Sequence, residues 1–477
     1  MLDFTRSAGE SVGRIGTALR RASALLSADD TDGVARRSGA IALVIRLASA
    51  GLAYVAQVVF ARMMGQFEYG VFAYTWVWFL VFSAVATLGF GDSPVRYVAQ
   101  LREREEIAHL RGFIRFAPLV MLASSVAFGA IVIALLPFAG RFLEHAYLMP
   151  MALMVISVPF ACLQSFLEGL GRSYNWTIPA LLPVYILRQG LLLVIMAAAV
   201  ALGFDATAIT GYICLVLTMV ISTAYQALAI RRRVHRVVER GPRAYRPREW
   251  MRGSAPFAVL YGTQHLSSFA DVLVLSFFVS PAAIAIYFAA TRIIQVVNLI
   301  PYAATVGTAH LFSAAFTRGD HDELQRLCRQ VAATTLAIAA VALAIMVGAG
   351  DRLLHMFGHG FDAGYTPLVI LAAGVLARVA AGPAEDMLNM TGHSNVSAST
   401  YLAVVVVNVL LAVALIIPFG LNGAAVASAI SLALRALWLS WAVWRRLQIH
   451  TSILAILAAG GLSAVRFRNE HLRAPAE

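Results

Sequence analysis

Residues 231–252 read RRRVHRVVERGPRAYRPREWMR and contain nine arginines against Glu239 and Glu249. This basic stretch lies between two long halves that consist largely of apolar runs. In membrane proteins, short connections rich in arginine stay on the cytoplasmic side and fix the topology of the helices around them. We therefore interpret the stretch as a cytoplasmic linker and work outward from it.

The composition of the chain is that of an integral membrane protein. Hydrophobic residues make up 60% of its 477 residues, charged residues 13%, and the mean hydropathy is +0.77. A soluble domain carries about 25% charged residues. Apolar runs of about 20 residues recur, each long enough to cross a bilayer as a helix, and none shows the alternation of a membrane β-barrel. The sequence therefore predicts an all-α membrane protein.

About twelve transmembrane helices are expected, six on each side of the linker. The two sets resemble each other weakly, which predicts two parallel repeats around a central cavity. The predicted organisation is a polar segment 1–37, a six-helix bundle 38–230, the linker 231–252, a second six-helix bundle 253–446 and a tail 447–477. The spans are expected at about 39–61, 70–91, 112–136, 149–170, 177–202, 207–230, 254–279, 283–304, 331–350, 366–390, 398–418 and 423–444.

The arginines orient these spans. Only Arg62, Arg141 and Arg352 fall in the connections on the side opposite the linker, so both termini are predicted to be cytoplasmic. Residues 1–37 lack the pattern of a signal peptide. They form either an amphipathic helix on an anionic inner leaflet or a disordered tail. The 13-residue apolar run from Ile453 to Val465 is too short to span and is expected at the interface.

Several functional classes are disfavoured. The net charge of +12 resides in the connections between apolar runs, where it sets topology, so no nucleic-acid partner is expected. All 37 basic residues are arginine, which excludes lysine chemistry. No Walker sequence is present, and no CxxC pattern accompanies Cys162, Cys214 and Cys328, so neither ATP hydrolysis nor a disulfide is expected. Cys162 and Cys214 fall in predicted spans and Cys328 in a cytoplasmic loop.

Several phrases resemble a known family. They are FARMMGQFEYGVFAY (60–74), LGFG (88–91) with Arg96, Leu371-x-x-Gly374, Asn389-x-x-Gly392, Asn408-Val409-x-Leu411 and IPFGLNGAA (417–425). Over about residues 38–448 the chain resembles the polysaccharide flippases of the multidrug, oligosaccharidyl-lipid and polysaccharide exporter (MOP) superfamily.

The resemblance implies a function. A flippase of this kind moves an undecaprenyl-pyrophosphate-linked oligosaccharide from the inner to the outer leaflet of the bacterial cytoplasmic membrane. The oligosaccharide is then used for O-antigen, capsule or exopolysaccharide. The implied partners are this substrate, membrane lipids, and a polysaccharide polymerase with its chain-length machinery.

Five arginines fall inside predicted spans: Arg46, Arg188, Arg292, Arg378 and Arg435. A guanidinium near the bilayer centre costs at least ~2.5 kcal/mol, so each should face a partner or a hydrated cavity. Arg46 and Arg435 lie close enough to a cytoplasmic rim either to contact substrate or to anchor their helices. Because the planar guanidinium binds phosphate oxygens through paired hydrogen bonds, a cationic cavity suits a pyrophosphate.

Polar residues at helical spacing are expected to complete the cavity. One stripe runs along the seventh span and should face the polar stripe of the first span across the cavity. Arg378 and Glu385, seven residues apart, should share a face of the tenth span. The predicted cavity residues besides the five arginines are Gln57, Tyr261, Ser268, Gln295, Asn298 and Tyr302.

Acidic residues within the spans have two interpretations. Asp271, Glu385 and Glu168 either neutralise the arginines or bind a coupling proton or sodium ion. Asp271 ranks first because His265, near its stripe, could carry protons. Apart from such an ion no cofactor and no metal site is expected. His355 and His359 have one-turn spacing but are better explained as interfacial residues.

Three other functions fit the sequence less well. A cation-coupled drug exporter of the same fold would concentrate acidic residues in the cavity of one half, whereas here arginine predominates. A peptidoglycan-precursor flippase usually has fourteen spans, and the terminal 13-residue run cannot supply two more. A membrane polymerase or glycosyltransferase usually carries a large outer loop or a catalytic domain, and neither is present.

Overall fold

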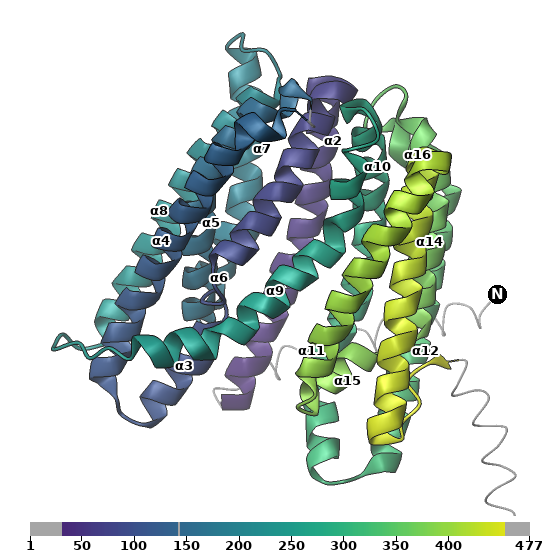
Figure 1. The fold of residues 1–477 in the computed structure, drawn as a ribbon. Helices are drawn as coiled ribbons and strands as arrows, with labels where there is room; N and C mark the ends of the chain where they lie inside the picture. Colours follow the sequence, from purple (N-terminus) through teal and green to yellow (C-terminus); the bar gives the residue numbers. More distant parts are fainter. Residues whose placement is uncertain (1–30, 142–143, 454–477) are drawn as a thin grey trace, which may run out of the picture.

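The computed structural model describes residues 31–141 and 144–453, which are almost entirely helical (Figure 1). The interpretations of residues 1–30, and of the apolar run after residue 453, lie outside the described part. In the first half the elements are α2 (Thr31–Ala86), α3 (Ser93–Glu103), α4 (Ile107–Ala139), η1 (His145–Tyr147), α5 (Leu148–Ser173), α6 (Thr177–Leu182), the π-helical turn η2 (Pro183–Leu187), α7 (Arg188–Ala201) and α8 (Ala208–Val237). In the second half they are α9 (Pro247–Leu275), α10 (Pro281–Gln295), η3 (Val296–Asn298), α11 (Leu299–Thr317), α12 (His321–Gly348), α13 (Gly350–His355), η4 (Phe361–Gly364), α14 (Tyr365–Ala380), α15 (Ala384–Met390) and α16 (Ser394–Leu447).

The predicted all-α membrane fold is confirmed. Within the described residues, nine helices are long and apolar enough to cross a membrane. Two of these, α2 and α16, each contain two predicted spans, joined at Gly65 (φ 73°) and Gly420 (φ 54°). A side chain at either position would be strained, since positive φ favours glycine. The remaining predicted span, the seventh, is α9, whose apolar pattern is interrupted by polar residues.

The tenth predicted span is wrong in one respect. A continuous helix over 366–390 was expected, but α14 ends at Ala380 and α15 starts only at Ala384. Gly382 between them has φ 74°, and Pro383 has no N–H to continue a helix. Arg378 and Glu385 therefore lie on different helices and do not share a face. The second span also ends early, at Ala86, in a turn that leads to α3.

The helices form two lobes that meet at the end opposite the linker (Figure 1). There the Nε of Arg62 donates to the carbonyl of Met356 (2.6 Å), and the amide of Gln66 donates to the carbonyl of His359 (2.9 Å). The ring of Tyr69 packs against Phe288 and Phe361 of the second lobe. At the linker end, α3 of the first lobe and α15 of the second lie far apart (Figure 1). The lobes are thus closed at one end and spread at the other.

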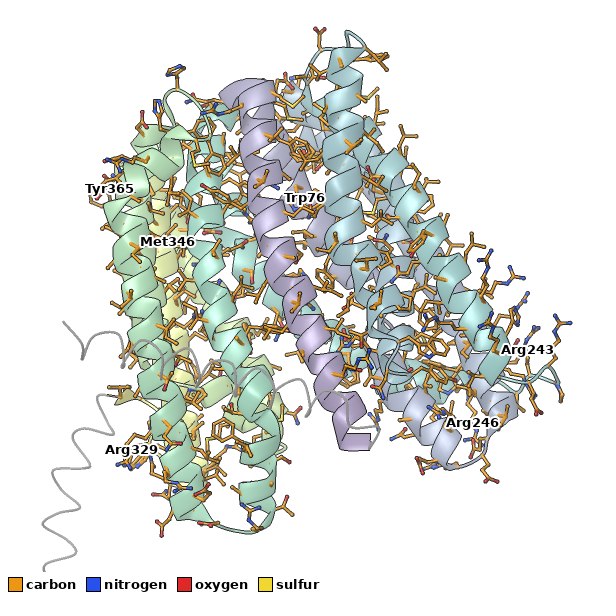
Figure 2. All side chains as sticks on the ribbon, turned by 180° about the vertical axis from the view of Figure 1, so that it is seen from behind. Trp76, Arg243, Arg246, Arg329, Met346 and Tyr365 are labelled. Carbon is orange, nitrogen blue, oxygen red and sulfur yellow. The ribbon has the colours of Figure 1, made fainter. Side chains whose placement is uncertain are left out.

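Arginines gather at the spread end on both lobes. Arg243 and Arg246 of the linker project from the first lobe, and Arg329 of α12 from the second (Figure 2). The linker lies against the first lobe, because the Nε of Arg111 donates to the carbonyl of Glu239 at 2.6 Å. The basic stretch is therefore held on one lobe rather than hanging free between the two.

Helix α9 follows the linker and contacts both lobes, running diagonally between them (Figure 1). Its first turn is fixed in the first lobe by Trp250, which is fully buried against Phe113 and Phe116. Its later turns pack on α16 of the second lobe. Residues 255–268 between these two anchors are more exposed, so this stretch joins the lobes with little packing of its own.

A Trp250→Ala variant is expected to lose stability, because truncating a buried tryptophan costs about 3–5 kcal/mol. The thermal midpoint should fall, and trypsin should cleave the linker faster since the arginines on it lose their support. Trp441→Ala, on the exposed face of α16, is the matched control and should change neither property. Equal effects from the two variants would show that the indole of Trp250 does not hold the linker in place.

Candidate functional site

The first polar pocket, here called the N-lobe pocket, has a volume of about 400 Å³. Helices α2, α5, α7 and α9, the π-helical turn η2 and the turn after α2 supply its charged and aromatic groups. Its polar lining includes Arg46, Asp92, Gln164, Glu168, Arg172, Tyr185, Arg188, Tyr261 and His265. The pocket therefore contains three arginines and two carboxylates.

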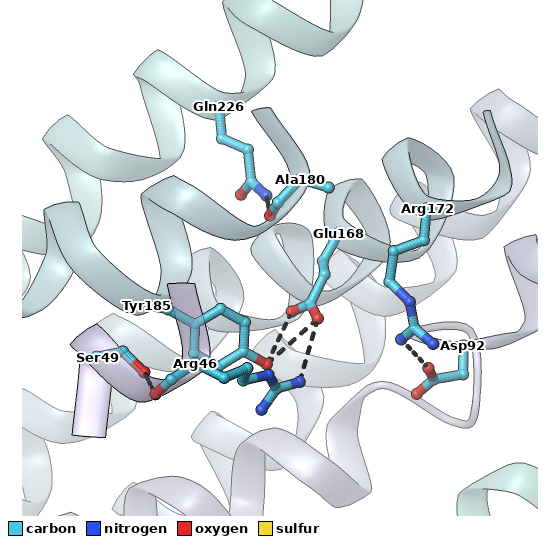
Figure 3. A network of polar contacts seen from close by, with 8 residues as sticks. All are labelled: Arg46, Ser49, Asp92, Glu168, Arg172, Ala180, Tyr185 and Gln226. Atoms are coloured by element: carbon cyan, nitrogen blue, oxygen red, sulfur yellow. Dashed lines mark hydrogen bonds and ion pairs between the residues drawn. The ribbon is translucent and has the colours of Figure 1, made fainter. Parts of the chain in front are cut away.

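The arginines Arg46 and Arg172 face carboxylates across this pocket (Figure 3). Arg172 Nη1 lies 3.1 Å from Asp92 Oδ1, and Arg46 Nη2 lies 3.9 Å from Glu168 Oε1. The hydroxyl of Tyr185 donates to Glu168 at 3.2 Å, and the Arg46 guanidinium lies 3.9 Å above the Tyr185 ring. The charge of these two arginines is therefore largely compensated within the lobe.

Arg188 occupies a special position in the backbone. It begins α7 directly after the π-helical turn that starts at Pro183. A proline inside a helix removes one backbone hydrogen bond, and π-turns often mark functional sites. The Nε of Arg188 is buried without a hydrogen-bond partner among the described residues. Arg188 thus lines the N-lobe pocket with one donor left unpaired within the described part of the chain.

The second lobe contains two adjoining pockets. The deep pocket (about 310 Å³) lies among α9, α10, α14 and α16, and the rim pocket (about 280 Å³) lies nearer the linker end, against α15. Asn298, Arg378 and Arg435 line both pockets. Arg378 Nη2 donates to Asn298 Oδ1 at 2.6 Å, and the Arg435 guanidinium lies 4.8 Å from the centre of the Tyr401 ring.

Carboxylates near these two arginines are bonded to hydroxyl groups instead. Tyr401 donates to both oxygens of Glu385 at 2.9 Å, and Thr305 donates to Asp386 at 2.6 Å. Within the described part of the chain, neither Arg378 nor Arg435 has a carboxylate oxygen within 4.0 Å. Within that part, these two arginines therefore make no direct ion pair, although Asp271, Glu385 and Asp386 line the same pockets.

Asp271 lies at the wall of the deep pocket and is 8% exposed. It accepts hydrogen bonds from the hydroxyls of Tyr287 (2.5 Å) and Ser428 (2.9 Å) and from the N–H of Val272 (2.8 Å). Asn408, on the same pocket, has a buried Oδ1 without a partner among the described residues. A buried carboxylate and an unsatisfied carbonyl oxygen on the walls of one pocket offer oxygen ligands that suit a small cation.

Most of the predicted site residues do line these pockets. The stripe on α9 is divided, because its first half belongs to the N-lobe pocket and its second half to the deep pocket. The N-lobe pocket has Arg46, Glu168, Arg188, Tyr261 and His265; the deep pocket has Ser268, Asp271, Gln295, Asn298, Arg378 and Arg435; the rim pocket has Tyr302 and Glu385 together with the shared residues.

Two predicted cavity residues lie elsewhere. Gln57 is buried where the two segments of α2 fold together, and its Oε1 accepts a hydrogen bond from Tyr69 (2.9 Å). Arg292 stacks its guanidinium on Phe288 (4.1 Å) and also approaches Phe269 (5.6 Å). Aromatic faces attract a guanidinium, so Arg292 finds its partner in the protein interior. Cys328 also differs from expectation, since it is buried in α12 rather than placed in a loop.

Sequence reasoning missed several pocket residues. Asp92 and Arg172 lie at the ends of spans, where a charge is not costly and so draws no attention. Asp92 directly follows the LGFG phrase, which indicates only the family resemblance. Asn408 likewise belongs to a noted phrase, whereas Ser428 and Ser431 give no signal in an apolar helix.

The family described as Polysaccharide biosynthesis protein matches residues 35–310, more than half of the chain. The chain belongs to this family. The family described as MatE matches residues 256–414. No curated protein matches the sequence. The resemblance inferred from the sequence phrases is therefore confirmed.

Solved structures of the MOP superfamily share the fold of this polysaccharide biosynthesis family member. An inward-facing multidrug resistance MATE transporter matches with a TM-score of 0.70 at 15% identity, covering 84% of this chain and 98% of its own. The Lipid II flippase MurJ in an inward closed conformation matches with a TM-score of 0.67 at 15% identity, covering 92% and 94%. An outward-facing MATE transporter gives a TM-score of 0.62 at 15% identity, covering 88% and 97%. The matched folds are those of transporters and flippases, and the chain is a multi-pass membrane protein.

Proposed function

We propose that the protein is a flippase that moves an undecaprenyl-pyrophosphate-linked oligosaccharide across the bacterial cytoplasmic membrane for surface polysaccharide synthesis. The observation that carries the proposal is the pair Arg378 and Arg435, whose guanidinium groups line a cavity with no carboxylate in ion-pair distance among the described residues. Such groups attract a dense anion and can bind its oxygens through paired hydrogen bonds. The family match to polysaccharide biosynthesis supports the same substrate class.

The N-lobe pocket suits the sugar portion of such a substrate. Tyr185 and Tyr261 offer ring faces, while Asp92, Glu168 and Arg172 offer the donors and acceptors that hydroxyl groups need. Because Arg46 and Arg172 are already paired and only Arg188 lacks a carboxylate partner among the described residues, most of this pocket favours a neutral polar ligand over a free anion. The glycan would then lie against the first lobe and the pyrophosphate against the second.

The linker end is proposed to face the cytoplasm, with both termini on that side. Arginine-rich connections stay inside, and this end carries Arg243, Arg246 and Arg329. The lobes are spread at the same end, and the fold matches an inward-facing MATE transporter with a TM-score of 0.70. The described state would thus receive substrate from the inner leaflet and release it after the lobes rock to open the opposite end.

The test is translocation by purified protein in proteoliposomes. A fluorescent undecaprenyl-pyrophosphate oligosaccharide should become accessible to an external glycosidase only when the protein is present. Lipid II and a cationic drug are the comparison substrates, since structural neighbours include a Lipid II flippase and multidrug transporters. Faster movement of either comparison substrate would refute the proposed specificity and assign the protein to that class instead.

Asp271 is proposed to bind the coupling proton or sodium ion. An Asp271→Asn variant keeps the hydrogen bonds to Tyr287 and Ser428 within reach but removes the negative charge that a cation needs. We expect ion-gradient-driven transport to fall to the rate seen without a gradient. Ser267→Ala, which alters the same pocket without touching a charge, is the control. If the variant still responds fully to a gradient, Asp271 is not the coupling site.

A further inference from the structure

An apolar groove of about 570 Å³ lies on the second lobe, beside the polar pockets. It runs between α11 and α12, and Leu47 of α2 lies at its edge. Its apolar lining includes Leu299, Ile300, Ala303, Leu311, Leu327 and Ile338. The groove is therefore bounded by both lobes at the point where α2 approaches α11.

Helix α11 has two different faces. Ile300, Ala303 and Leu311 recur at helical spacing and line the groove. Tyr302 and Thr305, on the adjacent face, line the rim pocket. One helix thus separates an apolar surface from a polar one.

The groove adjoins the rim pocket. Ala304 of α11 and Val331 and Thr335 of α12 line both. These side chains are small or β-branched, so the wall between the two spaces is thin. Beside it, the Arg46 guanidinium of the first lobe lies 5.7 Å from the centre of the Tyr302 ring. An amphiphile that crosses this thin wall would have its anionic group in the rim pocket and its apolar chain in the groove.

We propose that the groove between α11 and α12 holds the first part of the substrate's polyprenyl chain while Arg378 and Arg435 hold its pyrophosphate. This inference rests on the proposed function. The α11 segment from Leu299 to Leu311 is about 18 Å long at 1.5 Å per residue, so it can guide an extended chain away from the head group. Because lipid is as apolar as the groove, the groove adds little affinity and acts mainly to position the head group.

Photocrosslinking in lipid nanodiscs tests this placement. The probe is undecaprenyl pyrophosphate with a diazirine in its first isoprene units, in a bilayer of phosphatidylethanolamine and phosphatidylglycerol. Mass spectrometry should find adducts on groove residues. Ala303→Trp fills the groove and should reduce these adducts about tenfold, because the indole takes the place of the chain there. Val341→Trp, on an exposed part of α12 outside the groove, should leave them unchanged.

Competition identifies the occupant. Unlabelled undecaprenyl pyrophosphate should suppress the adducts, and extra phosphatidylglycerol should not. Equal suppression by phosphatidylglycerol would identify a phospholipid site and overturn the proposal. Ile300→Trp is a second groove variant, to be used if Ala303→Trp lowers the thermal midpoint of the protein. Unchanged labelling of a groove variant that is folded would also overturn the proposal.

The transport assay separates this inference from the proposed function. If the protein translocates the lipid-linked oligosaccharide but gives no groove adducts, the groove assignment is wrong and the flippase function stands. If groove adducts form and respond as expected but no oligosaccharide is translocated, the groove binds polyprenyl pyrophosphate and the flippase function is wrong.

Discussion

A Gly70→Ala variant is expected to lose most of its transport activity by forcing apart the closed end of the molecule. A Cβ at Gly70 would overlap the backbone carbonyl of Pro281, where α2 of the first lobe meets α10 of the second. A backbone atom cannot rotate away, so the lobes must shift. Overpacking costs about 1–3 kcal/mol. That cost changes the balance between closed and open states by about 5- to 150-fold.

Distances between spin labels measure this shift. Phe67 and Met356 are exposed on opposite lobes at the closed end and can each be replaced by cysteine, while the native cysteines are buried. In Gly70→Ala the distribution should move to longer distances. Gly51→Ala in the same helix is the control, because a Cβ there meets no atom within 4 Å. If the two variants give the same distribution, close packing at Gly70 does not hold this end shut.

The bilayer explains why the spans could be predicted from the sequence. A helix that crosses hydrocarbon needs about 20 apolar residues, and this requirement is visible in composition alone. The interruptions are less visible. Gly382-Pro383 is a known helix-breaking pair, but it lies within an otherwise apolar run and was included in the tenth span. Gly65 and Gly420 join pairs of spans because their positive φ values turn the chain without a loop.

The site was predicted less completely than the spans. The cost of a buried charge predicts that Arg188, Arg378 and Arg435 need polar surroundings, and the structure places all three at the walls of polar pockets. Helical spacing then predicts which residues lie together. This prediction is wrong for α9, because the first half of its polar stripe lines the N-lobe pocket and the second half lines the deep pocket. It is also wrong for Arg292, whose aromatic partners resemble ordinary core residues in sequence. Contacts between distant helices decide both cases, and local periodicity carries no information about them.

The two lobes differ in how their arginines are satisfied, and the difference has a functional consequence. Arg172 and Arg46 of the first lobe face carboxylates, whereas Arg378 donates to the neutral Asn298 and Arg435 lies on the Tyr401 ring. An incoming anion would have to displace a carboxylate from Arg46 or Arg172 in the first lobe, where Arg188 alone makes no ion pair among the described residues, but from neither Arg378 nor Arg435 in the second. The second lobe should therefore supply most of the binding free energy for a pyrophosphate.

Replacing both Arg378 and Arg435 with alanine is accordingly expected to abolish transport. A hydrogen bond to a charged group is worth about 1.5–3 kcal/mol, so losing one at each arginine weakens binding about 10²- to 10⁴-fold. Translocation of the lipid-linked oligosaccharide in proteoliposomes measures the effect. Arg329 is an exposed arginine of α12 at the linker end (Figure 2). Arg329→Ala is the control, because it also removes a positive charge, and it should retain activity. Lysine at both positions restores charge without the planar fork and should restore only part of the rate. If a double alanine variant folds, inserts and still translocates at the wild-type rate, the second lobe does not bind the pyrophosphate.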